Sequence, residues 1–295
     1  MTALEPAGPV TERLRVQGRD RTLTVSRRSG APSDAAPVIL ALHGSNQNAA
    51  TFRAFLGGAF DRFATEDGAV VAYLDGHKGH WNDARLSNRF AGRIEGYDDV
   101  AFVRAALDLL VQRYHADPAR AYAVGYSNGG QMVIRLVHEI PELLAGAAIL
   151  SATQPAPENF APDVTQDRPL PVLLLHGTKD PLVPYSGGQA SLWGFRPRGP
   201  GLSAPDTAAY YADRNGIIDE PTTRRVTRPG RRGAGYVTRT DYRQAGHHPV
   251  TLFTVHGGGH SVPGSKKAPF LMGRTNRDLD TVAAVSGFFG LRTPS

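Results

Sequence analysis

The stretch Ala121-Tyr-Ala-Val-Gly-Tyr-Ser-Asn-Gly-Gly130 decides the fold of this chain. An apolar run of strand character ends in Gly125-Tyr126-Ser127-Asn128-Gly129, and a segment of helical pattern follows at once. A serine on a sharp strand-to-helix turn exposes its hydroxyl, and the backbone there approaches so closely that side chains two residues away have no room. The pattern therefore predicts a nucleophilic serine at position 127, with Gly125 and Gly129 as the residues that permit the turn.

The segment after the serine has the apolar spacing of a helix. Its apolar face is formed by Met132, Val133, Leu136, Val137 and Ile140, and Pro141 closes it. A glycine-rich turn without chemistry is the structural alternative, because Gly-x-Ser-x-Gly also arises by chance in loops. The strand before the serine and the helix after it favour the catalytic interpretation.

Continuous apolar runs of strand length indicate a sheet that is buried on both faces. These runs lie at residues 38–42, 69–74, 145–150, 172–175 and 250–255, and a further strand is expected at 236–242. Residues 11–28 alternate polar and apolar around Gly18-Arg19-Asp20, which is typical of an edge hairpin. The sequence predicts an α/β fold with a mostly parallel central sheet, helices on both faces and an antiparallel N-terminal edge hairpin.

Helices are expected at 51–63 with a break near Gly57-Gly58, at about 100–114 after a cap at Tyr97-Asp98-Asp99, and at 279–289. We expect a single domain over residues 1–295, with its core at about residues 12–290. From 187 to 235 the apolar pattern degrades into an irregular excursion or flap, with one helix expected at 205–214. Its basic tract is interpreted as an exposed loop or β-excursion, and comprises Arg224, Arg225, Arg228, Arg231 and Arg232.

Composition excludes several classes of protein. No apolar run is long enough to span a bilayer, and the absence of cysteine excludes disulfides, a thiolate nucleophile and a cysteine-ligated metal. The net charge of +6 comes from arginines spread over the whole length, so we expect a solvated basic surface and no nucleic-acid partner. No signal peptide is visible at the start, which predicts a cytoplasmic protein unless the start has been trimmed. The sequence leaves the oligomeric state open.

A catalytic serine needs a base and a buried carboxylate that orients the base. In folds with this turn, the three follow successive strands in the order serine, acid, histidine. Asp180 comes just after the strand at 172–175, at a turn sharpened by Pro181, and His260 lies in a glycine-rich turn after the last strand. We therefore expect Ser127, Asp180 and His260 to form the catalytic set, with His256 as the competing candidate for the base.

The polar loop at 75–83 follows a central strand, where loops line the ligand crevice of such sheets. His77 and His80, flanked by Asp75 and Asp83, raise the possibility of a metal site. Their spacing matches no defined ligand motif, so we expect no metal and no cofactor.

Six motifs together resemble the polyhydroxybutyrate-depolymerase and feruloyl-esterase-like group of α/β-hydrolases. They are His43-Gly-Ser-Asn-Gln47, Trp81-Asn-Asp83, Asp98-Asp-Val100, Gly125-Tyr-Ser-Asn-Gly-Gly130, His176-Gly-Thr-Lys-Asp-Pro-Leu-Val-Pro-Tyr185 and Gly257-Gly-Gly-His-Ser-Val-Pro-Gly264. The resemblance covers about residues 35–290. By position it implies Ser127 as nucleophile, Asp180 as acid, His260 as base, and the backbone N–H groups of Ser45 and Asn128 as the oxyanion hole.

The resemblance implies a serine carboxylesterase that forms an acyl-enzyme and acts on small or oligomeric esters of hydroxyalkanoate, feruloyl or acetyl type. Two departures bear on the substrate: secreted members carry a cysteine where Ser45 stands, and polymer depolymerases append a substrate-binding domain that this chain lacks. An acyltransferase using the same triad and a non-catalytic ligand-binding module remain as alternatives.

Four residues are expected to contact substrate: His43, Trp81, Tyr126 and Trp193. Trp81 stands among glycines and polar residues with no apolar periodicity that ties it to the core, so it is interpreted as one wall of the acyl pocket. Trp193 and Phe195, beside Gly194, are expected to form the opposite wall as a mobile aromatic flap. The alternative for Trp81 is a side chain that anchors its own loop.

Overall fold

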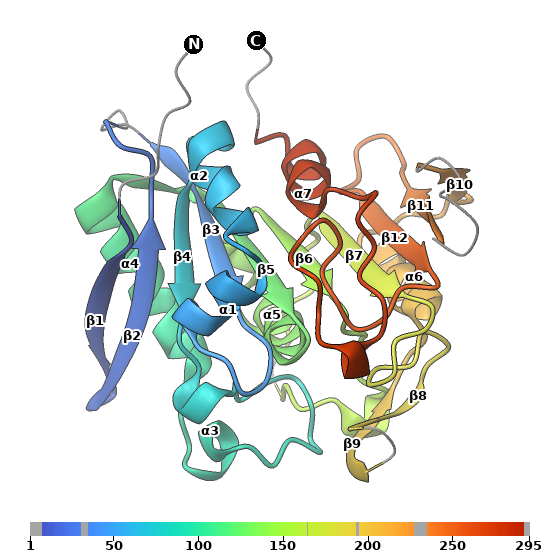
Figure 1. Ribbon diagram of the computed structural model, residues 1–295, viewed down its shortest axis with the longest axis horizontal. Helices are drawn as coiled ribbons and strands as arrows, with labels where there is room; N and C mark the ends of the chain where they lie inside the picture. The colour runs from blue at the N-terminus through green and yellow to red at the C-terminus, as the bar shows by residue number, and fades with distance from the viewer. Residues whose placement is uncertain (1–7, 31–34, 164, 193–194, 227–234, 292–295) are drawn as a thin grey trace.

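The computed structural model contains a ten-stranded sheet between two layers of helices, and describes residues 8–30, 35–163, 165–192, 195–226 and 235–291 (Figure 1). In sheet order the strands are β1 (Val10–Val16), β2 (Arg19–Ser26), β4 (Val70–Leu74), β3 (Ala36–Leu42), β5 (Ala116–Tyr126), β6 (Gly146–Leu150), β7 (Val172–Gly177), β12 (Val250–His256), β11 (Tyr236–Tyr242) and β10 (Thr222–Arg225). The strands from β4 to β12 run parallel, and those at both edges are antiparallel. The predicted fold class is confirmed.

Helices cover both faces of the sheet (Figure 1). On one face lie α1 (Ala49–Phe55), α2 (Arg62–Asp67) and α7 (Thr281–Phe289); on the other lie α4 (Asp99–Tyr114), α5 (Asn128–Glu139) and α6 (Ala204–Arg214). A short α3 (Ala91–Ile94) and five 3₁₀ turns lie in the connections; the turns are η1 (Ala59–Asp61), η2 (His77–Gly79), η3 (Pro141–Leu143), η4 (Pro157–Asn159) and η5 (Phe270–Met272).

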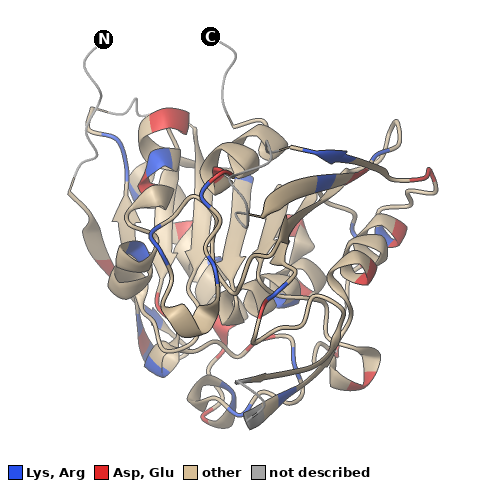
Figure 2. Cartoon of the chain, turned by 45° about the vertical axis from the view of Figure 1, so that its right-hand side comes forward, with Lys and Arg blue, Asp and Glu red and all other residues tan. Residues whose placement is uncertain are grey.

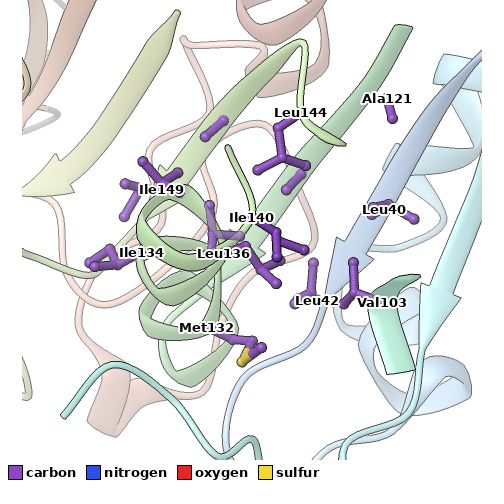
Figure 3. Packing of buried hydrophobic residues seen from close by; sticks show 14 of the residues in the cluster. Leu40, Leu42, Val103, Ala121, Met132, Ile134, Leu136, Ile140, Leu144 and Ile149 are labelled. Atoms are coloured by element: carbon purple, nitrogen blue, oxygen red, sulfur yellow. The ribbon is translucent and has the colours of Figure 1, made fainter. Parts of the chain in front are cut away.

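Strand β3 shows why the central strands are apolar throughout. Successive side chains of a strand point to opposite faces. Leu40 and Leu42 pack into the core beneath α4 and α5 (Figure 3), whereas Ile39 and Ala41 belong to the core beneath α1 and α2. Because both faces are covered, every position from Val38 to Leu42 is buried.

Two local predictions concern turns. The helix break near Gly57 and Gly58 is confirmed, because both glycines have positive φ and separate α1 from α2. The hairpin turn lies earlier than predicted: Gln17 and Gly18, both with positive φ, form it, and Arg19 already pairs with Val16. The apolar alternation of β2 sets this register, because Leu23 and Val25 must face the core.

The excursion at 187–235 has more regular structure than its sequence indicates. β8 (Gly188–Leu192) and β9 (Phe195–Gly201) pair as a separate antiparallel hairpin, and α6 confirms the expected helix. Arg224 and Arg225 lie on the exposed edge strand β10, which agrees with a β-excursion, while 227–234 lie outside the described residues.

The charged residues are dispersed. Lys and Arg, blue in Figure 2, occur in elements across the molecule, among acidic residues shown in red. Of the helices in the described ranges, none has both the length and the apolar character needed to cross a bilayer.

Candidate active site

Ser127 lies on the turn between β5 and α5 with φ 55 and ψ −116, a backbone conformation that serine rarely adopts. The neighbouring glycines make this turn possible. A Cβ on Gly125 would lie 2.2 Å from the carbonyl oxygen of Gly129, and a Cβ on Gly129 would lie 2.1 Å from that of Leu42. Any side chain at either position would force the backbone apart, as the sequence argument anticipated.

His260 connects Ser127 to Asp180. Its Nε2 lies 2.8 Å from Ser127 Oγ, and its Nδ1 lies 2.7 Å from Asp180 Oδ2. These partners assign the ring proton to Nδ1, which donates to the carboxylate, and leave Nε2 to accept from the hydroxyl. Residues 127, 180 and 260 come from three separate stretches of the chain and meet at the carboxyl ends of β5, β7 and β12. This is the hydrogen-bonded arrangement that nucleophilic catalysis by serine requires.

Asp180 is held as a charged acceptor. Its Oδ1 accepts from the backbone N–H groups of Leu182 and Val183, at 2.8 and 2.9 Å. Burial opposes ionisation, but the charge and hydrogen bond of His260, together with His176 and Val183, outweigh it and hold the pKa of Asp180 below its ordinary value. The carboxylate therefore stays ionised at neutral pH.

A second histidine, which the sequence analysis did not assign, faces the same carboxylate. His176 is buried at the end of β7; its Nε2 lies 3.5 Å from Asp180 Oδ2 and donates to the carbonyl oxygen of Val183 at 2.9 Å. Burial lowers the pKa of His176, so the ring is neutral and positions the turn that carries Asp180. The i, i+4 spacing of His176 and Asp180 is the signal that could have drawn attention to it.

The loop after β12 holds His260 from both sides. Its backbone N–H donates to the carbonyl oxygen of Met272 at 2.7 Å, and its own carbonyl oxygen accepts from Tyr126 Oη at 2.9 Å. Tyr126 was expected to contact substrate, but its ring is 4% exposed and stacks on Phe52 and Phe55. Tyr126 therefore supports the backbone of His260 in this structure.

The two expected oxyanion-hole residues, Ser45 and Asn128, follow the neighbouring strands β3 and β5. Asn128 is the first residue of α5, where the N–H groups have no partner within the helix, and Ser45 lies half-buried in the loop after β3. The side chain of Asn128 is fixed at both ends. Its Oδ1 accepts from the backbone N–H of Trp81 at 2.9 Å, and its Nδ2 donates to Asp83 Oδ2 at 2.5 Å.

Trp81 and His43 were expected to contact substrate, but both side chains lie in the interior of the structure. Both side chains are 0% exposed, and their rings pack with centroids 4.9 Å apart. Trp81 Nε1 donates to the carbonyl oxygen of His43, while His43 donates from Nδ1 to the carbonyl of Gly44 and accepts at Nε2 from the N–H of Gly76. Trp81 has no apolar periodicity because its burial comes from segments distant in sequence, so it anchors its own loop.

Asp83 and Arg85 form a buried ion pair beside the candidate site, and the sequence analysis missed this pairing. Asp83 is fully buried and accepts from Arg85 Nη2 at 2.5 Å, from Arg85 Nε at 3.1 Å and from Asn128. The pair therefore links Asn128, the residue after Ser127, to the loop after β4. Two opposite charges two residues apart in a polar loop give only a weak sequence signal, because such spacing is common on surfaces.

The remaining expected residues lie elsewhere. His256, the competing base, stacks on Tyr236 and bonds to Thr238 at the β11 edge, away from Ser127. His77 pairs with Glu95, and His80 stacks on Phe90. Trp193 lies outside the described residues, as does the side chain of Phe195, so the expected flap stays a prediction.

The fold and this arrangement define an α/β-hydrolase with a serine-centred site. The phospholipase/carboxylesterase family matches residues 102–192. The chain is 32% identical over 287 residues to "Putative esterase NocK" of Nocardia uniformis subsp. tsuyamanensis, covering 92% of this chain and 80% of that protein. It is 28% identical over 252 residues to feruloyl esterase B of Piromyces equi, covering 82% of this chain and 42% of that protein.

A solved structure with the same fold is an acetyl xylan esterase from Aspergillus awamori, with a TM-score of 0.64 and 13% identity. The alignment covers 96% of this chain and 99% of that one. The chain belongs to the α/β-hydrolase family of serine esterases that includes these relatives, and it is a carboxylic ester hydrolase. The non-catalytic alternative is thereby set aside.

Proposed function

We propose that this protein is a serine carboxylesterase that forms an acyl-enzyme on Ser127 and releases the acyl group to water. The observation that carries the proposal is the continuous hydrogen-bonded set of Ser127 Oγ, His260 and Asp180, with distances of 2.8 and 2.7 Å. In this set each group has the partner that its role demands.

The reaction has two displacement steps. In the first, Ser127 Oγ attacks the ester carbonyl carbon while His260 Nε2 takes the hydroxyl proton; the C–O bond to the alcohol then breaks, and His260 protonates the departing alcohol oxygen. In the second, the water oxygen attacks the acyl carbon while His260 takes a proton from the water; the bond from the acyl carbon to Ser127 Oγ then breaks, and His260 returns the proton to Ser127 Oγ. Asp180 holds the tautomer and stabilises the imidazolium, and no cofactor takes part.

The negative oxygen formed in both steps needs donors that are already in place. We assign this role to the backbone N–H groups of Asn128 and Ser45. The bonds from Trp81 and Asp83 to the Asn128 side chain support the assignment, because they fix this residue at the start of α5.

The substrates we propose are small or oligomeric esters of hydroxyalkanoate, feruloyl or acetyl type. The sequence identity to a feruloyl esterase supports this range of substrates, as does the match to the phospholipase/carboxylesterase family. Hydrolysis is proposed ahead of acyl transfer; adding an alcohol acceptor and analysing the products would distinguish the two.

The test is Ser127→Ala. We expect loss of ester hydrolysis by about 10⁴-fold or more, because removing one member of a triad removes the function of the unit. Labelling by a fluorophosphonate should disappear with the hydroxyl, while circular dichroism and the melting temperature stay close to those of the wild type. His260→Ala should be as damaging, and the double variant hardly worse. Activity above about a tenth of wild type in Ser127→Ala would disprove the assignment.

A further inference from the structure

A small cavity lies next to the proposed triad. Its polar lining residues are Arg85, Gln131 and Thr153, and the rest of its wall is made of Pro, Gly, Ala and Val residues. Two lining residues bond directly to the triad: the N–H of Gln131 donates to the carbonyl oxygen of Ser127 at 2.9 Å, and the N–H of Val183 donates to Asp180. The space open to a water-sized group is about 20 Å³, which is enough for one small polar group.

Gln131 brings an unsatisfied acceptor to this cavity. Its side chain is 6% exposed, and its Nε2 donates to the carbonyl oxygen of Thr153 at 2.8 Å, which fixes the orientation of the amide. The other amide atom, Oε1, is buried and accepts no hydrogen bond from any described residue. Buried acceptors are nearly always paired, so this oxygen is open to a donor that the described residues do not supply.

Arg85 brings a donor whose charge is already balanced. The side chain is 8% exposed, and Asp83 accepts from its Nε and Nη2. Within the described part of the chain, Nη1 has no recorded acceptor. The cavity wall therefore combines one acceptor and one donor without a net charge.

We infer that this cavity binds a hydroxyl group of the ester substrate, with Gln131 Oε1 accepting the O–H and Arg85 Nη1 donating to the hydroxyl oxygen. The inference rests on the proposed function and narrows its substrates to esters that carry a hydroxyl on the acyl or the alcohol part. A hydroxyl both donates and accepts, so it satisfies both groups. A carboxylate would place negative oxygen against Gln131 Oε1, and an alkyl group would leave that oxygen unpaired.

The first test compares esters that differ by one hydroxyl. For the acyl part, the pairs are methyl 3-hydroxybutyrate against methyl butyrate, and methyl ferulate against methyl 3-methoxycinnamate. For the alcohol part, 2-hydroxyethyl acetate is compared with ethyl acetate. We expect kcat/KM to be about tenfold or more higher for the hydroxylated ester, either in the acyl pairs or in the alcohol pair. The pair that shows this preference identifies which side of the ester enters the cavity. No preference in any pair would overturn the inference.

Two substitutions of Gln131 separate hydrogen bonding from shape. Gln131→Met removes the acceptor and keeps the length of the side chain, so the preference ratio should fall to about one. Gln131→Glu can donate to the Thr153 carbonyl in its neutral form and keeps an acceptor oxygen, so the preference should be retained. The readout is the ratio of kcat/KM for the two esters of a pair. A general loss of activity or of folded protein lowers both values and leaves this ratio unchanged. A preference that persists in Gln131→Met would overturn the inference.

Gln154→Met is the matched control. Gln154 is an adjacent buried glutamine outside the cavity, and its Oε1 already accepts from Tyr211 Oη at 3.1 Å. This variant should lower the melting temperature and leave the hydroxyl preference at the wild-type ratio. If wild type lacks the preference but Ser127 is labelled by a fluorophosphonate and Ser127→Ala is inactive, the hydroxyl inference fails while the proposed function stands.

Discussion

The two loops that flank Ser127 are held by opposite means. On the Asn128 side, the loop after β4 is fixed by side chains: Asp83, Arg85 and Trp81 form buried hydrogen bonds that converge on Asn128 and His43. On the His260 side, the loop after β12 is held by close backbone contacts at glycines, together with the bond from Tyr126 Oη to the carbonyl oxygen of His260. A Cβ on Gly177 would lie 2.4 Å from the carbonyl oxygen of Gly258, and a Cβ on Gly259 would lie 2.2 Å from that of Met272.

The difference predicts different kinds of damage. A buried polar network fails by leaving charges and hydrogen-bonding groups unpaired, which lowers the free energy of unfolding. Where the backbone is in close contact, an added side chain pushes the loop away, and the neighbouring His260 moves with it. Substitutions on the Asn128 side should therefore affect stability most, and substitutions on the His260 side should affect catalysis most.

The largest effect is expected for Gly259→Ala. The new methyl group would collide with the carbonyl of Met272, and His260, the next residue, would move relative to Ser127. A displacement of about 1 Å at such a site lowers kcat by about 10²-fold. Steady-state kinetics with a p-nitrophenyl ester would measure this. Gly287→Ala on α7 is the control, because Gly287 has no positive φ and its Cβ would meet nothing within 4 Å, and it should keep most of the activity.

Asp83→Asn should have the next largest effect, which is a decrease in the free energy of unfolding. The substitution leaves Arg85 as a buried charge without its partner and places an amide against the Nδ2 of Asn128. Breaking a buried ion pair in this way costs about 3–5 kcal/mol, which urea denaturation would measure. Glu66→Gln, which breaks the partly exposed Arg62–Glu66 pair, should cost less than about 1 kcal/mol. Equal losses in the two variants would contradict the contrast between the loops.

The smallest expected effect is the change of stability with pH that arises from His43, on the Asn128 side. Burial lowers the pKa of His43 from its ordinary 6.5 to about 4, and His138 on α5 behaves in the same way. As pH falls from about 6.5 to about 4, the unfolded chain binds protons that the folded chain excludes, so stability falls by up to about 3 kcal/mol for each ring. Below about pH 4 both states are protonated, and this loss levels off.

Urea denaturation at about pH 7 and about pH 5 would measure this dependence. His43→Gln should show a smaller difference between the two pH values than wild type, although its stability at neutral pH is lower. His138→Gln, remote from Ser127, should reduce the difference to a similar extent. A pH dependence unchanged in both variants would show that the two rings are not the groups responsible.

Most of the fold could be predicted because its signals are local. The apolar runs of β3, β4, β6, β7 and β12 are continuous, and both faces of the sheet are covered, so each run indicates a buried strand without reference to its partners. The predictions for the edge strands of the sheet were less accurate. The turn at Gln17 and Gly18 lies one residue before the expected one, because register depends on which residues the neighbouring strand buries.

The sequence by itself determined the serine turn, the order of Ser127, Asp180 and His260, and the glycines around them. Each can be read from the spacing of residues along the chain, and short-range steric contacts dictate the geometry of the serine turn. Only the tertiary structure decided that Trp81 is buried, that His176 faces Asp180, and that Asp83 joins Arg85 to Asn128. These facts depend on segments tens of residues apart that meet at the same end of the sheet, and no local pattern encodes such a meeting.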